Sequence, residues 1–379
     1  MTEPSAYELN AWRNIQQFKG RPLSQAMRNV GEQVANGAEK LGERANQYLE
    51  SQPRAQAVVV RGQRFAAKSA HVVSTKARAV ATAIPDGLSD WGGAAFGSMR
   101  QAVGKVSRAG LSPTRVVAKH QKKGHDVTHL FDLRGLDLEQ IDAVRRRGTN
   151  WIYPAIAAAS GAAAGAVITG GEGSIAITGG AAAAPSGAAI TGALLGDAAV
   201  VQGLASRCVG HVSLLYGYDP EDPAEKLFVM SVLNAGTAMS TSAKYAAMAD
   251  ISKLTQALYR GRSWAVLLDT SVVAQVSKKF TEKFIGRLTK QGLGKVVPAA
   301  GIALGGAFNW TTLEGVVDVA DTEYRRRFLL EKYPHLADEE AVEPVCDLVP
   351  EGAVIEEDAV DEEISVLDEI VEAGGPDLR

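Results

Sequence analysis

The sequence predicts an all-α fold, a multi-helix bundle with Gly/Ala-rich central helices and a disordered acidic C-terminal tail. Apolar residues recur every three or four positions along much of the chain, and strand-like alternation of useful length does not occur. Aromatic residues make up 6% of the 379 residues although 46% are hydrophobic, so much of the apolar content is alanine. Small side chains let helices pack closely.

Charge separates the tail from the body. Residues 338–379 carry sixteen acidic residues and one basic residue, whereas residues 1–337 carry 39 basic and 27 acidic residues, a net charge of +12. A basic body with an acidic tail suggests an anionic partner and an internal competitor for that partner. A segment this acidic and without aromatic residues is typical of disorder, or of a short helix near residues 361–372 that forms on a basic surface.

The N-terminal region is expected to form amphipathic helices. Apolar positions repeat at helical spacing over residues 22–50, a second helical pattern follows Pro53, and a Pro-Asp-Gly turn begins at Pro85. We therefore expect three regions, which are N-terminal helices over 1–84, a helical domain over 85–333 and the acidic tail over 334–379.

Basic residues concentrate between Arg54 and Lys123, where thirteen basic residues occur with two acidic ones. A solvated helix face is one interpretation. Contact with phosphate groups is the other, because each basic residue near an anionic membrane contributes about 1 kcal/mol. Nucleic acid is disfavoured because few aromatic residues are interleaved to stack on bases. The candidates for contact with anionic lipid are Arg61, Arg64, Lys68, Lys76 and Arg78.

Two uncharged segments follow, residues 148–171 and 174–196, and each is long enough to span a bilayer. Few of their residues are Val, Ile, Leu or Phe, which favour insertion by only about 0.3–0.6 kcal/mol each. The sequence leaves open a buried hairpin of tightly packed helices, a transmembrane pair and reversible insertion. A third uncharged segment, 296–313, has Gly301 and Gly305 at the spacing of close helix contacts.

A long helix is expected from about Gly187 to Tyr218. Asp197, Arg207 and His211 fall on one arc of this otherwise apolar helix. Burial without partners would cost several kcal/mol, so Asp197 and Arg207 should pair with each other's surroundings or with another helix. A buried polar seam that fixes helix register, a ligand or proton site, and an exposed face are the three interpretations.

The acidic, proline-rich turn after this helix predicts a helix start. Asp222 stands at the N-cap, proline follows it, and Glu225 lies three residues on, which is the pattern of a capping box. We therefore predict that Asp222 and Glu225 cap a helix. A divalent cation at Asp219, Glu221 and Asp222 is disfavoured because no second carboxylate cluster lies nearby in sequence. Further helices are expected over 242–261 and 271–293, and in a segment ending near Leu329.

Other reactive motifs are incomplete. His120, His125 and His129 offer zinc donors, but their spacing matches no metal motif, and Gly124 interrupts the helix that would align them. The GGEGS stretch from residue 170 has neither the ending of a phosphate loop nor the spacing of a nucleophile elbow. The two cysteines define no disulfide framework. We predict no metal site and no cofactor.

Several motifs recur in a familiar order. They are the two glycine-rich segments, the run from Asp197 through Arg207 to the Tyr-Asp-Pro-Glu-Asp-Pro turn at 218–223, Lys244, and VVPAAGIALGGAFNW followed by Tyr324 and Arg327. In this order the chain resembles the EcsC family of bacterial proteins over about residues 85–333. That family is largely uncharacterised and is named for a gene beside an ABC transporter implicated in secretion. The resemblance implies membrane association, and it carries over no catalytic residue.

Three functions follow as hypotheses. The first is a non-enzymatic helical protein, peripheral or inserted at the cytoplasmic membrane, that meets an anionic membrane surface; the N-terminus shows no secretory signal pattern. The second is a hydrolase-like enzyme for a lipid-like substrate, which requires its candidate residues to converge on an open pocket. The third is a scaffold or regulatory partner of a transporter that binds through the acidic tail. The catalytic candidates are Asp197, Arg207, His211, Tyr218 and Asp219.

Overall fold

The structure, a computed structural model, describes residues 3–18, 20, 111–145, 151–162, 164, 183–259, 270–293, 301–337 and 364–378. Every regular element in these ranges is helical, which confirms the predicted all-α fold. The elements are α1 (Ala6–Gln17), α5 (Pro113–Gln121), the 3-10 helix η1 (Leu130–Gly135), α6 (Leu138–Val144), a helix over 151–162, α8 (Ala183–Leu215), α9 (Pro223–Gly236), α10 (Thr241–Tyr259), α12 (Thr270–Leu293), α13 (Gly301–Lys332) and α15 (Val366–Glu372).

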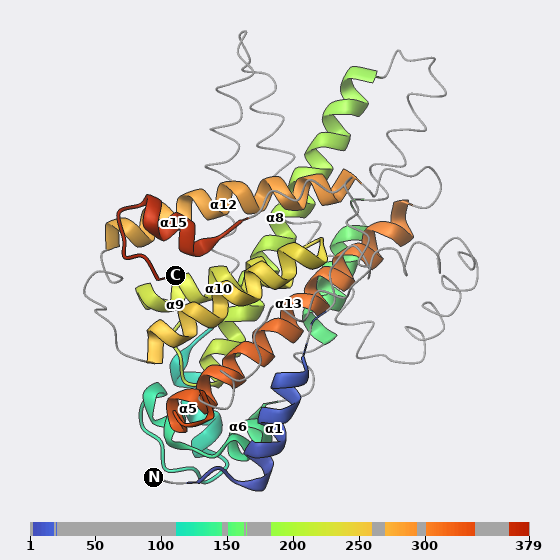
Figure 1. The fold of residues 1–379 in the computed structure, drawn as a ribbon. Helices are drawn as coiled ribbons and strands as arrows, with labels where there is room; N and C mark the ends of the chain where they lie inside the picture. Colours follow the sequence, from blue (N-terminus) through green and yellow to red (C-terminus); the bar gives the residue numbers. More distant parts are fainter. Residues whose placement is uncertain are drawn as a thin grey trace, which may run out of the picture.

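The long helices α8 and α13 organise the core. Helix α13 packs against both α8 and α9, and α9 also contacts α10 and α12. Figure 1 shows α12 running across α8, with α15 beside α12 and the short helices α1, α5 and α6 gathered at the opposite end of the molecule. The buried side chains of α8, α9 and α13 form one continuous hydrophobic core.

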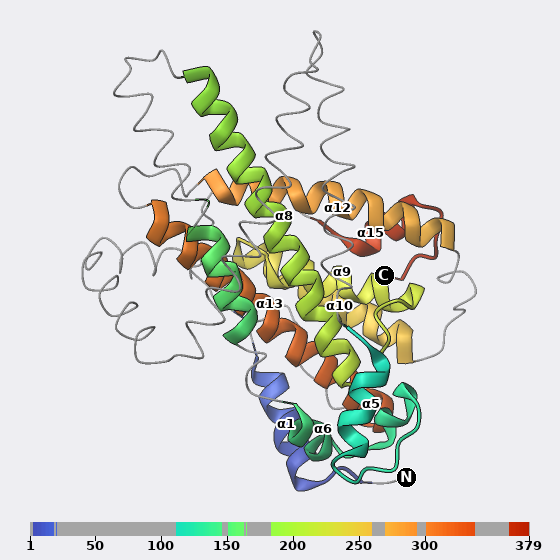
Figure 2. The ribbon, with the colours of Figure 1, turned by 180° about the vertical axis from the view of Figure 1, so that it is seen from behind.

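Glycine lets the helix of residues 151–162 lie directly on α13. A Cβ atom added at Gly161 would overlap the carbonyl oxygen of Gly305, and one at Gly306 would lie 3.1 Å from the carbonyl oxygen of Ala158. Only residues without a side chain permit this approach of two backbones. Figure 2 shows this helix beside α13 and α8. The small residues therefore have the packing role that the sequence predicts.

Helix α1 holds the beginning of the chain against the end of α13. Ser5 caps the helix in a capping box with Glu8, whose side chain is 1% exposed. The Glu8 carboxylate accepts hydrogen bonds from Lys332 Nζ (3.0 Å), Tyr333 Oη (2.8 Å) and the backbone N–H of Leu138 (3.3 Å). The Ser-x-x-Glu pattern at residues 5–8 was available in the sequence, and our sequence analysis missed it.

The end of the acidic tail is ordered. Residues 364–378 form and flank α15, and its side chains Val366, Leu367 and Ile370 are at most 1% exposed. The predicted disorder is wrong for these residues, because three apolar side chains bury against the bundle. The alternative of a short helix near 361–372 on a basic surface agrees with the structure.

Helix α8 contains a segment, Gly196–Leu215, that is long and apolar enough to cross a membrane. In the structure 72% of its most apolar window is buried inside the protein, which is also how the core helix of a soluble protein appears. The N-terminal half of α8 continues past α12 in both views (Figures 1 and 2).

Several predicted elements and candidate residues lie outside the described ranges. The amphipathic helix over 22–50, residues 165–182 of the uncharged segments and the five lipid-contact candidates between Arg61 and Arg78 all lie there. The division into three regions stays a prediction.

Candidate functional site

The polar face of α8 divides into two separate places. Asp197 lies near the middle of the helix, whereas Arg207 and His211 lie three to four turns further along. Because a helix rises about 1.5 Å per residue, Asp197 and Arg207 are about 15 Å apart along the axis. One face of a helix therefore holds two sites with different surroundings.

Asp197 belongs to a closed polar junction of three helices. Its Oδ1 accepts hydrogen bonds from Ser160 Oγ (3.0 Å) and from Asn309 Nδ2 (2.7 Å), and Asn309 Nδ2 also donates to the carbonyl oxygen of Ala157 (3.0 Å). All three polar side chains are at most 6% exposed. Asp197 thus pairs with other helices, one of the two arrangements we expected, and the contacts fix the register of α8, the 151–162 helix and α13.

Arg207 and His211 line a pocket of about 210 Å³ with Tyr153. Tyr153 Oη lies 3.3 Å from His211 Nδ1, and the two rings meet edge to face. The remaining wall is apolar and consists of Ile152, Ile156 and Leu204. The pocket combines one cationic group, two neutral polar groups and an apolar wall.

Burial sets the protonation states in this pocket. Burial, together with the nearby positive charges of Lys119, Arg207 and Arg145, lowers the pKa of His211 to about 4. Burial also raises the pKa of Tyr153 above its ordinary value. At neutral pH the imidazole and the phenol are therefore both uncharged, and Arg207 supplies the positive charge.

The predicted catalytic set does not converge on this pocket. Asp197 is held in its own junction, and no carboxylate of the described residues lines the pocket. Asp219 lies in the turn before α9, where its Oδ1 accepts the backbone N–H of Glu221 (3.0 Å). An imidazole without a neighbouring carboxylate can bind or orient a ligand, but it lacks the partner of an acid–base pair.

Tyr218 lies between two guanidinium groups in the core. The Cζ atoms of Arg134 and Arg327 each lie 4.1 Å from the centre of its ring. Tyr218 is fully buried, and its hydroxyl has no hydrogen-bond partner among the residues that the structure describes. Burial raises the pKa of this phenol well above its ordinary value. Tyr218 is a cation–π partner in the core and does not line the pocket of Tyr153 and His211.

The predicted capping box at the start of α9 is wrong in its side-chain contacts. Asp222 is the N-cap residue and proline follows it, as predicted, but the Asp222 side chain makes no capping hydrogen bond. Glu225 turns inward instead, accepting hydrogen bonds from Arg327 Nη1 (2.7 Å) and Tyr324 Oη (2.5 Å). A buried arginine without an anionic partner costs more free energy than a helix gains from a side-chain cap, so Glu225 pairs with Arg327.

This buried ion pair was missed by the sequence analysis. Glu225 and Arg327 are 3% and 5% exposed, and Arg327 Nε also contacts Glu331 Oε1 (2.9 Å). Burial by itself would lower the pKa of Arg327, but Glu225, Tyr218, Glu331 and Tyr324 together outweigh burial and raise that pKa. The available signal was three consecutive arginines, 325–327, inside an apolar helix, where at least one must face the core.

A second polar cluster holds α6 and the segment that follows α8 to α13. Arg325 Nη2 contacts both carboxylate oxygens of Asp142 (2.7 and 2.8 Å), and Arg325 Nε donates to Tyr216 Oη (3.2 Å). Tyr216 Oη donates to Asp321 Oδ1 (2.9 Å), which also pairs with Arg145. The C-terminal half of α13 is therefore joined to the rest of the bundle by arginine–carboxylate pairs.

Lys244, one of the residues that carry the family resemblance, is buried at the start of α10. Its Nζ donates to the carbonyl oxygen of Ala235 (2.7 Å) in the last turn of α9. Burial lowers the pKa of Lys244 to about 8, although Asp318 and Glu323 oppose this shift. The lysine satisfies a carbonyl at a helix C-terminus, where a positive charge is favourable.

Metal-binding patterns do not assemble in the described ranges. His120 Nδ1 lies 3.0 Å from His125 Nδ1, while His129 lies apart and contacts Thr128 and Asp132. Within the described residues no group of three or more potential ligands could hold a metal ion.

Comparison with known proteins identifies the same family that the sequence motifs indicate. The model of the EcsC protein family matches residues 171–329, which confirms the resemblance there. YdbA, an uncharacterised protein of Bacillus subtilis (strain 168), is 26% identical over 142 residues, 37% of this chain and 48% of its own length. The chain therefore spans about half the length of this curated relative. No solved structure matches the chain significantly.

Proposed function

We propose that this protein is a non-enzymatic helical protein that associates with the cytoplasmic membrane through anionic lipid, in a role accessory to transport or secretion. The observation that carries this proposal is the first half of α8. Residues 183–196 contain no charged residue, and the backbone of this half continues past α12 (Figure 1). An uncharged helical segment that extends beyond the other described helices is suited to contact with hydrocarbon.

Exposed tryptophans support the proposal. Trp151 and Trp310 are 43% and 36% exposed, and they belong to the two helices that cross at Gly161 and Gly305. Tryptophan is enriched at membrane–water interfaces because its ring is amphipathic. The net charge of +12 on residues 1–337 adds an attraction to anionic lipid.

The pocket of Tyr153, Arg207 and His211 favours binding over hydrolysis. An enzyme of the kind we considered needs Asp197 beside His211, and Asp197 is hydrogen-bonded to Ser160 and Asn309 instead. An arginine with an apolar wall is suited to an acidic group that carries an apolar part.

Flotation with lipid vesicles tests the proposal. We expect the protein to float with vesicles of phosphatidylglycerol and phosphatidylcholine at low salt, and much less with phosphatidylcholine alone or at high salt. Retention after an alkaline carbonate wash would indicate insertion. Failure to float with anionic vesicles at low salt would refute the proposal.

Two variants sharpen the test. Changing Arg61, Arg64, Lys68, Lys76 and Arg78 to glutamine should reduce flotation with anionic vesicles. The double variant Trp151→Ala/Trp310→Ala should reduce it as well, whereas Phe131→Ala, which removes a 69% exposed aromatic ring in η1, should leave it unchanged. Equal loss in the tryptophan variant and in this control would remove the support from the tryptophans.

A further inference from the structure

The C-terminal helix α15 occupies a surface formed by α9, α10 and α12. Its apolar side chains Val366, Leu367 and Ile370 are buried there, while Val371 on the outer face is 41% exposed. An amphipathic helix laid on a surface of other helices is the geometry of helix-in-groove recognition.

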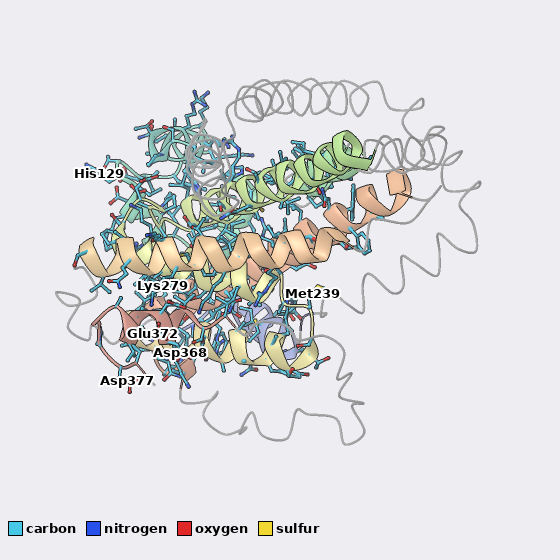
Figure 3. All side chains as sticks on the ribbon, turned by 90° about the horizontal axis from the view of Figure 1, so that it is seen from above. His129, Met239, Lys279, Asp368, Glu372 and Asp377 are labelled. Atoms are coloured by element: carbon cyan, nitrogen blue, oxygen red, sulfur yellow. The ribbon has the colours of Figure 1, made fainter. Side chains whose placement is uncertain are left out.

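Charge complementarity orients α15 on α12. Glu369 is 1% exposed and pairs with Lys283 and, at 3.6 Å, with Lys279. Lys279 Nζ also lies 2.7 Å from Glu372 Oε2. Figure 3 shows Lys279 and Glu372 on the facing sides of the two helices. A buried carboxylate with two lysine partners distinguishes this contact from apolar burial alone.

Polar contacts fix the beginning of α15 in register. Ser365 Oγ accepts the N–H of Asp368 as the helix cap (3.2 Å) and donates to Asp250 Oδ2 of α10 (2.6 Å). Asn234 Nδ2 of α9 donates to the carbonyl oxygen of Ile364. The surface thus contacts the apolar face, the acidic edge and the N-terminus of the helix that it holds.

The receiving face of α12 has the matching pattern. Val272, Val276, Lys279 and Lys283 recur at intervals of four, three and four residues, so they share one face of the helix. Val272 and Val276 are at most 6% exposed, whereas the side chains of Lys279 and Lys283 remain 35% and 41% exposed. An apolar stripe with a lysine edge selects a helix with an apolar stripe and an acidic edge.

We propose that this surface of α9, α10 and α12 is a docking site for an acidic amphipathic helix of a partner protein, and that α15 occupies it in cis as an autoinhibitory ligand. The partner helix carries apolar residues at the positions of Val366, Leu367 and Ile370 and acidic residues at those of Glu369 and Glu372. Because α15 belongs to the same chain as the site, its effective concentration there is on the order of 1 mM, so a partner must bind more tightly than α15 or act when α15 is released. This inference does not depend on membrane association.

A labelled peptide of residues 362–379 tests the docking site in the full-length protein. The wild-type protein should not bind it, because α15 fills the site. The full-length variant Leu367→Ser/Ile370→Ser, which releases α15 without changing the net charge, should bind the peptide with a Kd below about 1 mM, because cis occupancy requires an affinity better than the effective concentration. Val371→Ser changes the same helix on its exposed side and should behave as the wild type.

A charge exchange tests the specificity. In the released variant, Lys279→Glu/Lys283→Glu should weaken binding of the native peptide at least tenfold and favour a peptide with Glu369→Lys/Glu372→Lys. Circular dichroism establishes that each variant is folded. If the folded released variant fails to bind the peptide, or binds anionic vesicles more tightly while ignoring the peptide, the proposal is wrong. If the wild-type protein did not bind anionic vesicles, the proposed membrane function would be refuted, but this inference would still stand.

Discussion

At the scale of single residues, the interior of this bundle contains several paired charges. Glu8, Glu225 and Glu369 are each at most 3% exposed, and each carboxylate contacts at least one Lys or Arg side chain. Breaking such a pair leaves an uncompensated charge in the core, whereas replacing both partners does not. The main effect of these pairs is therefore to specify which helices pack together, and their contribution to net stability is smaller.

The pair of Glu225 and Arg327 shows this difference most directly. Arg327→Met should lower the free energy of unfolding by about 3–5 kcal/mol, because Glu225 remains buried without its cation. The double variant Glu225→Leu/Arg327→Met should recover most of that loss. Urea unfolding followed by circular dichroism measures both values.

The exposed pair of Lys226 and Glu221 provides the control. Lys226 Nζ lies 3.7 Å from Glu221 Oε2, and the side chains of Lys226 and Glu221 are 38% and 53% exposed. Lys226→Met should therefore change stability by at most about 1 kcal/mol. A loss at Arg327 as small as the loss at Lys226, or losses that simply add in the double variant, would contradict the structural role of the pair.

At the scale of elements, small residues decide how closely helices approach. The 151–162 helix and α13 meet backbone to backbone at Gly161 and Gly305, and the hydrogen bonds of Asn309 and Asp197 lie beside this crossing. Alanine and glycine make the contact close enough for a buried amide to reach a carboxylate and a backbone carbonyl at once. Packing and polar register are thus coupled in one crossing.

Gly161→Ala tests this coupling. The added methyl group would overlap the carbonyl oxygen of Gly305, so we expect a loss of about 1–3 kcal/mol in the free energy of unfolding. Gly196→Ala is the matched control, because a Cβ there meets nothing within 4 Å, and higher helix propensity should stabilise the protein by up to about 1 kcal/mol. If both variants gave the same change in urea unfolding, helix propensity and not the crossing would control stability.

At the scale of the whole molecule, the first helix α1 and the last helix α15 both pack against the central helices. Glu8 of α1 contacts Lys332 and Tyr333 at the end of α13, and α15 docks on α12. Local patterns predicted the helices, because apolar spacing, glycine and proline act within a few residues. They could not predict that Glu225 faces Arg327, since that contact depends on α9 meeting α13 a hundred residues later.

The candidate site shows the same limit. Helical spacing placed Asp197, Arg207 and His211 on one face of α8, and that much is correct. Helical spacing could not predict that Ser160 and Asn309 donate hydrogen bonds to Asp197, or that Tyr153 lies beside His211, because these partners belong to other helices. The order of the family motifs identified the family, whose model matches residues 171–329, because recognising that order needs no knowledge of contacts.

The link between the first helix and α13 predicts how stability depends on pH. Burial alone would raise the pKa of Glu8, but hydrogen bonds from Ser5, Lys332, Tyr333 and Leu138 outweigh it and lower the pKa to about 2. A carboxylate whose pKa is lowered by folding stabilises the folded state above its ordinary pKa of 4.5. That contribution is lost as the pH falls from about 4.5 through 2.

Glu8→Gln isolates this contribution. At pH 7 the variant should be about 2–3 kcal/mol less stable than the wild type, and the difference should shrink steadily as the pH falls from about 4.5 to 2. Glu3→Gln makes the same charge change at an exposed position before α1 and should match the wild type at every pH. Urea unfolding at several pH values measures the three curves. If the Glu8→Gln curve ran parallel to that of the wild type, ionisation of Glu8 would not stabilise the contact between α1 and α13, and other contacts of α1, such as the burial of Trp12 and Ile15, would hold the helix in place.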